Sequence, residues 1–286
     1  MCSGRVPITN ECGLKTHEQR HRTLFDHLNE VGGRHMTDKA FIKGINLLTA
    51  LAQSPTPRAL TGLAEQLGLT KSNTHRLLNT LIEQGFAVQD GNKGLYRPTL
   101  RLWELGSQIV GRLDFVGVAR EFMPKLAATT GETVHLSVLQ GADVIYLDKT
   151  EGTQVVRSYT QVGERAPAWC VATGKILLAY LEPDRLRELV PKLRAYTPKT
   201  ITDHTKLNKE LKAARTQGIA YNRGEWREDV VGSATAIFDA SGNPIAAIGI
   251  SGPAVRLQKG ILEKHSSAVI EAGHAISRAL GYAGAP

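Results

Sequence analysis

The stretch LTKSNTHRLLNTLIEQGF, residues 69–86, strongly constrains how this 286-residue chain can fold. Its apolar residues recur at helical spacing on one side, whereas polar residues occupy the other side. A shorter amphipathic segment precedes it, begins at a predicted N-cap, Thr61, and ends at Gly68. Two short helices joined by a tight turn that contains glycine are typical of a helix-turn-helix.

The segments on either side of this pair complete a small domain. Before it, Phe41, Ile45 and Leu51 recur at helical spacing, and the segment QSPTP ends that helix with two prolines. After it, FAVQD and LYRP alternate like strands around the turn GNKG, which predicts a basic hairpin. The sequence therefore predicts a winged helix-turn-helix over residues 37–98.

The polar helix face is consistent with a solvated surface or with a nucleic-acid contact. The chain carries a formal net charge of +8, and residues 36–112 hold nine Lys and Arg against five Asp and Glu, an excess of 9 − 5 = 4. This basic excess and the adjoining hairpin favour double-stranded DNA. Arginine and asparagine can each form paired hydrogen bonds with a base edge, and small or basic residues near a helix start suit phosphates. We expect DNA contacts from Thr70, Lys71, Ser72, Asn73, His75, Arg76, Asn79, Lys93 and Arg97.

The rest of the chain predicts a linker helix and a larger domain. Residues 99–112 read as a helix that carries Trp103 and other apolar residues, and a longer helix is expected over 114–130. Strand-like runs TVHLSVLQ, VIYLDK and VVRSY follow, then helical segments, a second hairpin (VGSATAIFD and PIAAIGISG) and a closing helix over 258–280. This mixture predicts an α+β domain over 113–286. Residues 1–36 show no sustained period and are interpreted as a flexible extension.

Catalytic and metal-binding patterns are sparse. Three scattered cysteines without a CxxC pair argue against a disulfide framework or a zinc site, and we predict no metal or cofactor. ATGK is not a phosphate-binding loop, because Trp169 and Ile176 stand where glycine and Ser or Thr are needed. An enzyme would need a pair such as Cys170 with His135. Glu225 and its acidic neighbours are expected on an exposed loop, and the amides that begin the ATGK helix would attract an anion.

Segments from both domains resemble the IclR family of bacterial transcription regulators. These are ALTGLAEQLGLTKSNTHRLLNTLIEQGFAVQDGNKGLYRPTLRLWELG, GERAPAWCVATGKILLAY and DASGNPIAAIGISGPAVR, within residues 40–283. The resemblance implies a C-terminal domain somewhat like a GAF domain, with a curved antiparallel sheet that encloses a small-molecule pocket. By the same resemblance, the residues expected to bind the effector are Trp169, Ala172, Thr173, Asn222, Glu225, Val230, Gly232, Gly249 and Ser251.

The resemblance also implies partners. A dimer or dimer of dimers on a palindromic operator is expected, with the linker helix coupling the pocket to the DNA-binding domains. Trp169 replaces a common family histidine, which suggests an aromatic or other apolar organic acid as effector, although a core tryptophan explains this residue equally well. Two alternatives remain open. One is a small-molecule-processing enzyme or metabolite-binding module with a winged helix that does not bind DNA, and the other is a winged helix that contacts only proteins. No apolar run approaches the roughly 20 residues that span a bilayer, and no signal-peptide pattern begins the chain, so a cytoplasmic protein without membrane contact is expected.

Overall fold

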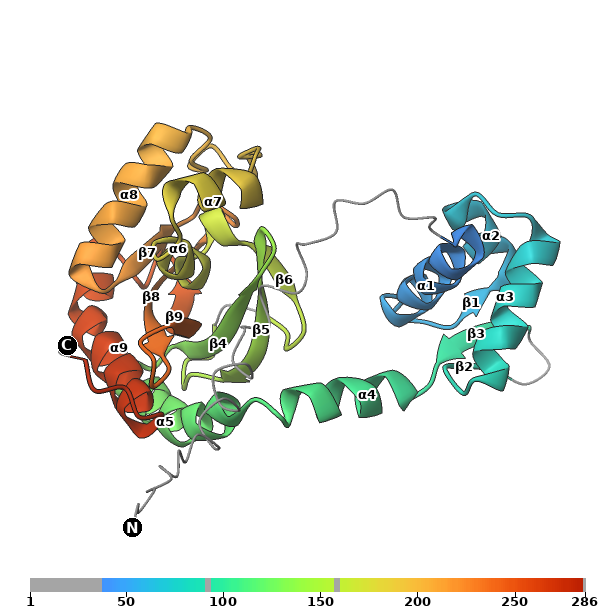
Figure 1. Ribbon diagram of the computed structural model, residues 1–286, viewed down its shortest axis with the longest axis horizontal. Coiled ribbons are helices and arrows are strands. Elements are labelled where there is room, and N and C mark those ends of the chain that lie inside the picture. Colours follow the sequence, from blue (N-terminus) through green and yellow to red (C-terminus); the bar gives the residue numbers. More distant parts are fainter. Residues whose placement is uncertain (1–37, 91–93, 157–159, 285–286) are drawn as a thin grey trace, which may run out of the picture. The chain divides into compact units, whose positions relative to one another are not determined.

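The computed structural model describes residues 38–90, 94–156 and 160–284, which form two compact units divided between Thr99 and Leu100 (Figure 1). The predicted extension over 1–36 lies outside the described residues. A three-stranded antiparallel sheet in the order β1-β3-β2 accompanies the three helices of the first unit. Its elements are α1 (Lys39–Ala52), β1 (Arg58–Ala59), α2 (Leu60–Leu67), α3 (Lys71–Glu83), β2 (Ala87–Asp90) and β3 (Leu95–Pro98).

The turn between α2 and α3 follows from local chemistry. Gly68 ends α2 with a φ of 62°, in the left-handed region that a residue without a side chain adopts at little cost. Thr70 then caps α3, as predicted, because its Oγ1 accepts a hydrogen bond from the Asn73 amide at 3.3 Å. The predicted cap at Thr61 is wrong. Pairing of β1 with β3 keeps the backbone extended through Ala59, so α2 begins immediately afterwards, at Leu60.

The core of the first unit gathers one face of each helix against the sheet. Leu47 and Leu51 of α1, Leu63 of α2 and Leu78 of α3 are completely buried in it, as an apolar face on each helix requires. The first turns of α1 differ from the predicted pattern, since Phe41, Ile42 and Ile45 are exposed. Only the second half of α1 contributes buried residues, so its N-terminal half presents apolar side chains that the described residues of this unit leave exposed.

The second unit is built on a six-stranded antiparallel sheet in the order β6-β5-β4-β9-β8-β7. The curved antiparallel sheet that was predicted is confirmed, and the first and last long strands, β4 and β9, pair at its centre. Its elements are α4 (Arg101–Val110), α5 (Asp114–Thr130), β4 (Thr133–Gln140), β5 (Asp143–Thr150), β6 (Arg165–Pro167), η3 (Ala168–Cys170), α6 (Ala172–Leu178), α7 (Pro183–Leu189), α8 (His204–Gln217), β7 (Ala220–Arg223), β8 (Val230–Phe238), β9 (Pro244–Pro253) and α9 (Lys259–Ala279).

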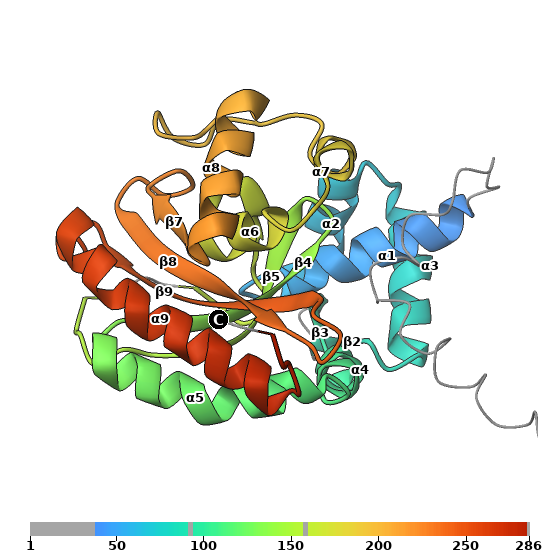
Figure 2. The same cartoon turned by 60° about the vertical axis from the view of Figure 1, so that its left-hand side comes forward.

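Successive side chains along each strand point to opposite faces of the sheet, where they enter two separate cores. On β9, Ala246, Ile248 and Ile250 pack with α5 and α9, whereas Ala247 packs with α6 and α8 on the opposite face. Figure 2 shows α5 and α9 side by side below the sheet, with α6 and α8 above it. Both faces of β4, β8 and β9 are therefore covered, which explains why these strands are almost continuously buried.

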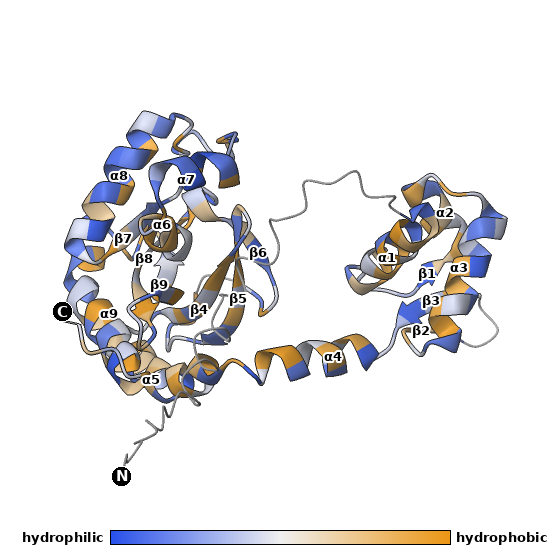
Figure 3. Cartoon of the chain, in the orientation of Figure 1, coloured by the Kyte–Doolittle hydropathy of each residue, from blue (hydrophilic) through white to orange (hydrophobic). Residues whose placement is uncertain are grey.

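Helix α4 has no buried residue, although it carries a broad apolar face (Figure 3). Leu100 beside its first turn is 80% exposed, and Trp103 and Ile109 are 70% and 60% exposed. An apolar helix face of this extent is expected to be covered by another surface, because exposed patches of large apolar side chains mark interaction sites.

Three expectations for the second unit need correction. The run VVRSY is not a strand where it is described, because Val155 and Val156 lie in a bend, and residues 157–159 lie outside the described residues. The edge strands β6 and β7 were not predicted, since three or four residues are too few to show an alternating pattern. Glu225 is buried rather than exposed, because it accompanies a buried lysine, Lys175.

Candidate DNA interface and ligand pocket

The polar face of α3 is exposed along its length. Lys71, Ser72, His75, Arg76 and Asn79 all point away from the core of the first unit, while Thr74 and Leu78 are buried on the other side. The N-terminus of α3 offers backbone amides that have no partner inside the helix, which suits a phosphate oxygen.

Three side chains in the first turns of α3 take part in local hydrogen bonds. The Thr70 hydroxyl accepts from the Asn73 amide, which leaves its proton available to donate to a phosphate. Arg76 Nη2 donates to Asn73 Oδ1 at 3.3 Å, so these two candidate base-reading side chains lie side by side on the exposed face. Arg97 is exposed on β3, and Lys93, the other predicted wing contact, lies outside the described residues.

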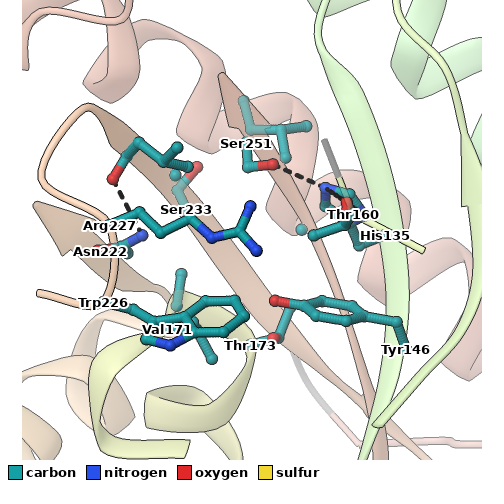
Figure 4. A pocket seen from close by; sticks show the side chains of 15 residues that line it. His135, Tyr146, Thr160, Val171, Thr173, Asn222, Trp226, Arg227, Ser233 and Ser251 are labelled. Carbon is teal, nitrogen blue, oxygen red and sulfur yellow. Dashed lines mark hydrogen bonds between the residues drawn. The ribbon is translucent and has the colours of Figure 1, made fainter. Parts of the chain in front are cut away.

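A pocket opens in the second unit between the centre of the sheet, the start of α6 and the segment between β7 and β8 (Figure 4). It encloses about 470 Å³ of empty space, a volume that includes the open solvent at its mouth. Its lining consists of His135, Tyr146, Thr160, Val171, Ala172, Thr173, Asn222, Trp226, Arg227, Val230, Gly232, Ser233, Gly249, Ile250 and Ser251.

Most of the residues expected to bind an effector are brought together in this lining. They come from four separate elements and are Ala172, Thr173, Asn222, Val230, Gly232, Gly249 and Ser251. Trp169 does not join them, because it packs in the core with its ring 6.0 Å from that of Tyr196. Glu225 also lies outside the lining, since its carboxylate turns to Lys175 at 2.5 Å. The structure therefore supports a core role for Trp169.

One part of the pocket carries a cluster of uncharged hydrogen-bonding groups. His135 Nε2 lies 2.7 Å from Ser251 Oγ, and Thr160 Oγ1 lies 3.2 Å from His135 Nδ1. Burial, and then the positive charge of Lys149, lower the pKa of His135 to about 4, so its imidazole is neutral at neutral pH. Burial, followed by the nearby charge of Glu164, raises the pKa of Tyr146, which keeps its hydroxyl protonated.

The other notable part of the pocket carries a cation above an aromatic ring. The Arg227 guanidinium carbon lies 4.7 Å from the centre of the Trp226 ring, and Arg227 Nη2 lies 3.0 Å from Glu164 Oε1. Figure 4 shows Trp226 and Tyr146 extending into the pocket from opposite sides, with the guanidinium above the indole. Among the described lining residues, Arg227 is the one cation, and no carboxylate is present.

Two buried hydroxyls in the lining have no hydrogen-bond partner among the described residues, Thr173 Oγ1 and Ser233 Oγ. A buried hydroxyl without a partner costs free energy, so each is a site where a polar ligand atom would be stabilised. Thr173 was predicted from the family pattern. Its amide lies in the first turn of α6, a seven-residue helix that begins after the extended residue Val171.

The glycines of the lining let two strands approach closely. A Cβ at Gly249 would lie 2.6 Å from the Ser233 carbonyl oxygen, and one at Gly232 would collide with the Ile250 carbonyl oxygen. Larger residues at these positions would push β8 and β9 apart. Both glycines therefore shape the pocket floor through the sheet and have no side chain with which to bind a ligand.

Several lining residues were missed because their roles depend on long-range contacts. Tyr146, Thr160, Trp226, Arg227 and Ser233 carry no motif in the sequence. The alternation of β5 and β8 would have placed Tyr146 and Ser233 on one face or the other, but not beside a cavity. His135 was considered only as a base for Cys170. That pairing has no support, since burial, and next Glu225, raise the pKa of Cys170 to about 12, while His135 contacts Ser251 and Thr160.

Neither metal ligation nor membrane spanning is indicated within the part of the chain that the structure describes. It contains no group of three or more His, Cys, Asp or Glu side chains arranged to hold a metal ion. Nor does any of its described helices have both the length and the apolar character needed to cross a membrane.

Comparison with known proteins identifies both units. Residues 107–278 match the family described as "Bacterial transcriptional regulator IclR C-terminal", and residues 41–91 match the "IclR helix-turn-helix domain". The chain belongs to the IclR family. Its first unit is therefore the DNA-binding part of a transcription regulator, and the second is the effector-binding domain of this IclR-family protein.

The sequences of two relatives align with this chain along nearly their whole length. The transcriptional regulator XynR of Escherichia coli is 31% identical over 242 residues, which cover 84% of this chain and 96% of XynR. The repressor AllR of Salmonella typhimurium is 34% identical over 248 residues, covering 85% and 90% of the two chains. Because these relatives are regulators and repressors, this IclR-family chain is a regulator, and the enzyme alternative is set aside.

A solved structure adds a ligand to the comparison. An IclR homologue of Microbacterium hydrocarbonoxydans, in complex with 4-hydroxybenzoate, superposes with a TM-score of 0.74 at 25% identity, over 84% of this chain and 98% of that one. That protein thus binds an aromatic acid, and this chain shares its fold.

Proposed function

We propose that this IclR-family regulator reads an operator with α3 and responds to a small carboxylic acid, in particular an aromatic one, bound in the pocket of its second unit. The observation that supports the acid is the charge of the lining. Among the described lining residues, Arg227 contributes a cation, none is a carboxylate, and His135 is neutral. A carboxylate is the ligand group that such a lining favours.

The proposed orientation of the acid follows from the two polar parts of the pocket. Its carboxylate meets Arg227, and its body lies against the rings of Trp226 and Tyr146. A hydroxyl elsewhere on the ligand would hydrogen-bond to the cluster of His135, Ser251 and Thr160. The unpartnered hydroxyls and other lining residues complete the contacts, namely Ala172, Thr173, Asn222, Val230 and Ser233. The predicted residues Gly232 and Gly249 shape the pocket floor beneath the ligand. The 4-hydroxybenzoate bound by the Microbacterium homologue has both groups and is the first ligand to test.

The proposed DNA contacts divide by chemistry. Arg76, Asn73 and Asn79 read base edges in the major groove, because their side chains form paired hydrogen bonds with guanine or adenine. The remaining predicted residues contact the backbone or flank the bases, namely Thr70, Lys71, Ser72, His75, Lys93 and Arg97. Exposure of the α3 side chains and of Arg97 supports this arrangement.

We further propose that the protein acts as a homo-oligomer on a palindromic operator. The support is apolar surface that the described residues of each unit leave uncovered. Phe41 and Ile45 are exposed on α1, and Trp103 and Ile109 are exposed on α4. Burial of such surfaces against a second copy would be favourable, and would place two copies of α3 on two half-sites. Helix α4, within the proposed linker 99–112, would couple the pocket to the spacing of those half-sites.

Fluorescence anisotropy tests this function directly. The full-length protein is titrated against labelled DNA from the region upstream of its own gene and against random DNA, with 4-hydroxybenzoate and other small acids added in turn. The proposal expects salt-sensitive, sequence-specific binding that one acid changes. Specific binding that no acid alters would reject the acid effector. The absence of salt-sensitive DNA binding at every site would favour a winged helix that contacts only proteins.

A further inference from the structure

A buried lysine lies behind the pocket and takes no part in its lining. Lys175 on α6 has a completely buried side chain, and its ammonium group donates to three acceptors from three segments. These are Glu225 Oε1 at 2.5 Å, Glu210 Oε1 of α8 at 2.9 Å and the backbone oxygen of Tyr221 in β7 at 3.0 Å. Because an ammonium group has three N–H donors, its capacity is completely used.

The partner Glu225 belongs to the segment that carries the pocket's cation and indole. Its second carboxylate oxygen accepts from the Arg223 amide, and its backbone oxygen accepts from Thr200 Oγ1 at 2.5 Å. Asn222 Oδ1 accepts from the amides of Gly224 and Glu225 at 2.9 and 3.2 Å, which closes a tight turn. The next two residues along the chain are Trp226 and Arg227, so the backbone position of Glu225 constrains the positions of both.

The lysine also connects this segment to a second wall of the pocket. Lys175 lies on the same short helix as Ala172 and Thr173, which line the pocket from α6. The network is balanced in charge, because Glu210 also accepts from Arg223 Nη1 at 3.2 Å, giving two cations and two carboxylates. A buried ion pair gains little net stability over apolar side chains of similar volume, because both charges lose their hydration. We therefore expect the Lys175–Glu225 ion pair to matter through the geometry that it imposes on the segments it joins.

We propose that Lys175 is a positioning residue. Through Glu225 it holds Trp226 and Arg227 at a defined distance from α6, and thereby determines how tightly the pocket binds its ligand. The effect on ligand affinity rests on the proposed function of the pocket, whereas the effect on the position of Trp226 does not. The two effects can be measured separately.

The position of Trp226 is measured without ligand. The chain has three tryptophans, so the substitutions Trp103→Phe and Trp169→Phe leave Trp226 as the single reporter. In this background, Lys175→Met is expected to increase acrylamide quenching of Trp226 by about twofold, because Glu225 loses its counter-ion and the segment is released. Lys212→Met, at an exposed position of the neighbouring α8, is the matched control and is expected to leave the quenching unchanged.

A double variant separates positioning from stability. Lys175→Met together with Glu225→Gln removes the uncompensated buried charge, so the thermal midpoint is expected to return toward that of the parent. The segment still lacks its connection to α6, so quenching of Trp226 is expected to stay high. If the double variant regains both the parental midpoint and the parental quenching, Lys175 has only a structural role and the proposal is overturned. If Lys175→Met alone does not fold, the double variant and Glu225→Gln by itself still give this comparison.

Ligand affinity is the second readout, with 4-hydroxybenzoate as the probe. Both variants that lack Lys175 are expected to bind it about tenfold more weakly than the parent, while their affinity for DNA without ligand is unchanged. Parental affinity in the double variant would contradict the proposal even if its quenching were altered. If the parent itself binds no acid, the proposed effector class fails, and the quenching comparison alone decides whether Lys175 positions the segment.

Discussion

Replacing Arg227 with methionine tests the charge on which the proposed effector depends. A hydrogen bond between a charged group and its partner contributes about 1.5–3 kcal/mol. The Arg227 side chain is 40% exposed and already lies 3.0 Å from Glu164, so solvent screening and this competing carboxylate place the expected loss near the lower bound. A loss of about 1.5 kcal/mol corresponds to roughly tenfold weaker binding of a carboxylate.

Isothermal titration calorimetry with a pair of ligands makes this test specific. Arg227→Met is expected to weaken binding of 4-hydroxybenzoate about tenfold. Binding of 4-hydroxybenzamide, which has the same shape without the charge, is expected to change little. Arg165→Met is the matched control, because that exposed arginine pairs with Asp143 outside the pocket. Equal losses for the acid and the amide would refute the reasoning, since they would assign Arg227 a packing role rather than recognition of charge.

Three further predictions concern the DNA interface, a buried ion pair and pH. Arg76→Ala is expected to cost about 1–3 kcal/mol on the operator and less on random DNA, as measured by anisotropy; equal losses on both would assign Arg76 to the phosphate backbone. Arg256→Ala leaves the buried carboxylate of Glu132 without its two hydrogen bonds from Arg256, of 2.6 and 2.7 Å. This substitution is expected to lower the free energy of urea unfolding by about 3 kcal/mol. A decrease below about 1 kcal/mol would show that solvent screens the ion pair. The pKa of His135 is lowered from 6.5 to about 4 in the folded state, so between these values the unfolded chain binds more protons. Stability is therefore expected to fall by up to about 3 kcal/mol as pH decreases from about 6.5 to 4, and the urea midpoint of His135→Gln should fall less over that range; an equal fall in both proteins would contradict the role of His135.

The DNA-binding unit could be predicted closely because its signals are local. The cap at Thr70, the left-handed turn at Gly68 and the apolar spacing of α3 all lie within about 20 residues of one another. The errors occurred where a nonlocal contact intervened. Strand β1 pairs with β3, which moved the start of α2 away from Thr61. Phe41 of α1 is left exposed by the described residues of its own unit.

The pocket was less predictable from the residues alone. The resemblance to a family correctly indicated seven of the fifteen described residues that line the pocket. It also included Trp169 and Glu225, whose side chains lie outside that lining. Whether a tryptophan faces a cavity or a core depends on what packs against it, here Tyr196. In the same way, whether the Glu225 carboxylate is buried or exposed depends on a cation 50 positions away in the sequence, Lys175.

The sequence by itself determined the long helices and most of the long strands, the polar face of α3, and the family to which the chain is similar. These properties depend on residue spacing, capping and glycine conformation, which act between near neighbours. Tertiary structure alone decided that His135 meets Ser251 across 116 positions, that Arg227 supplies the cation of the pocket, and that Lys175 is buried. The physical reason is that hydration and charge at a site are set by groups that antiparallel strand pairing brings together from distant parts of the chain, and no local pattern encodes those neighbours.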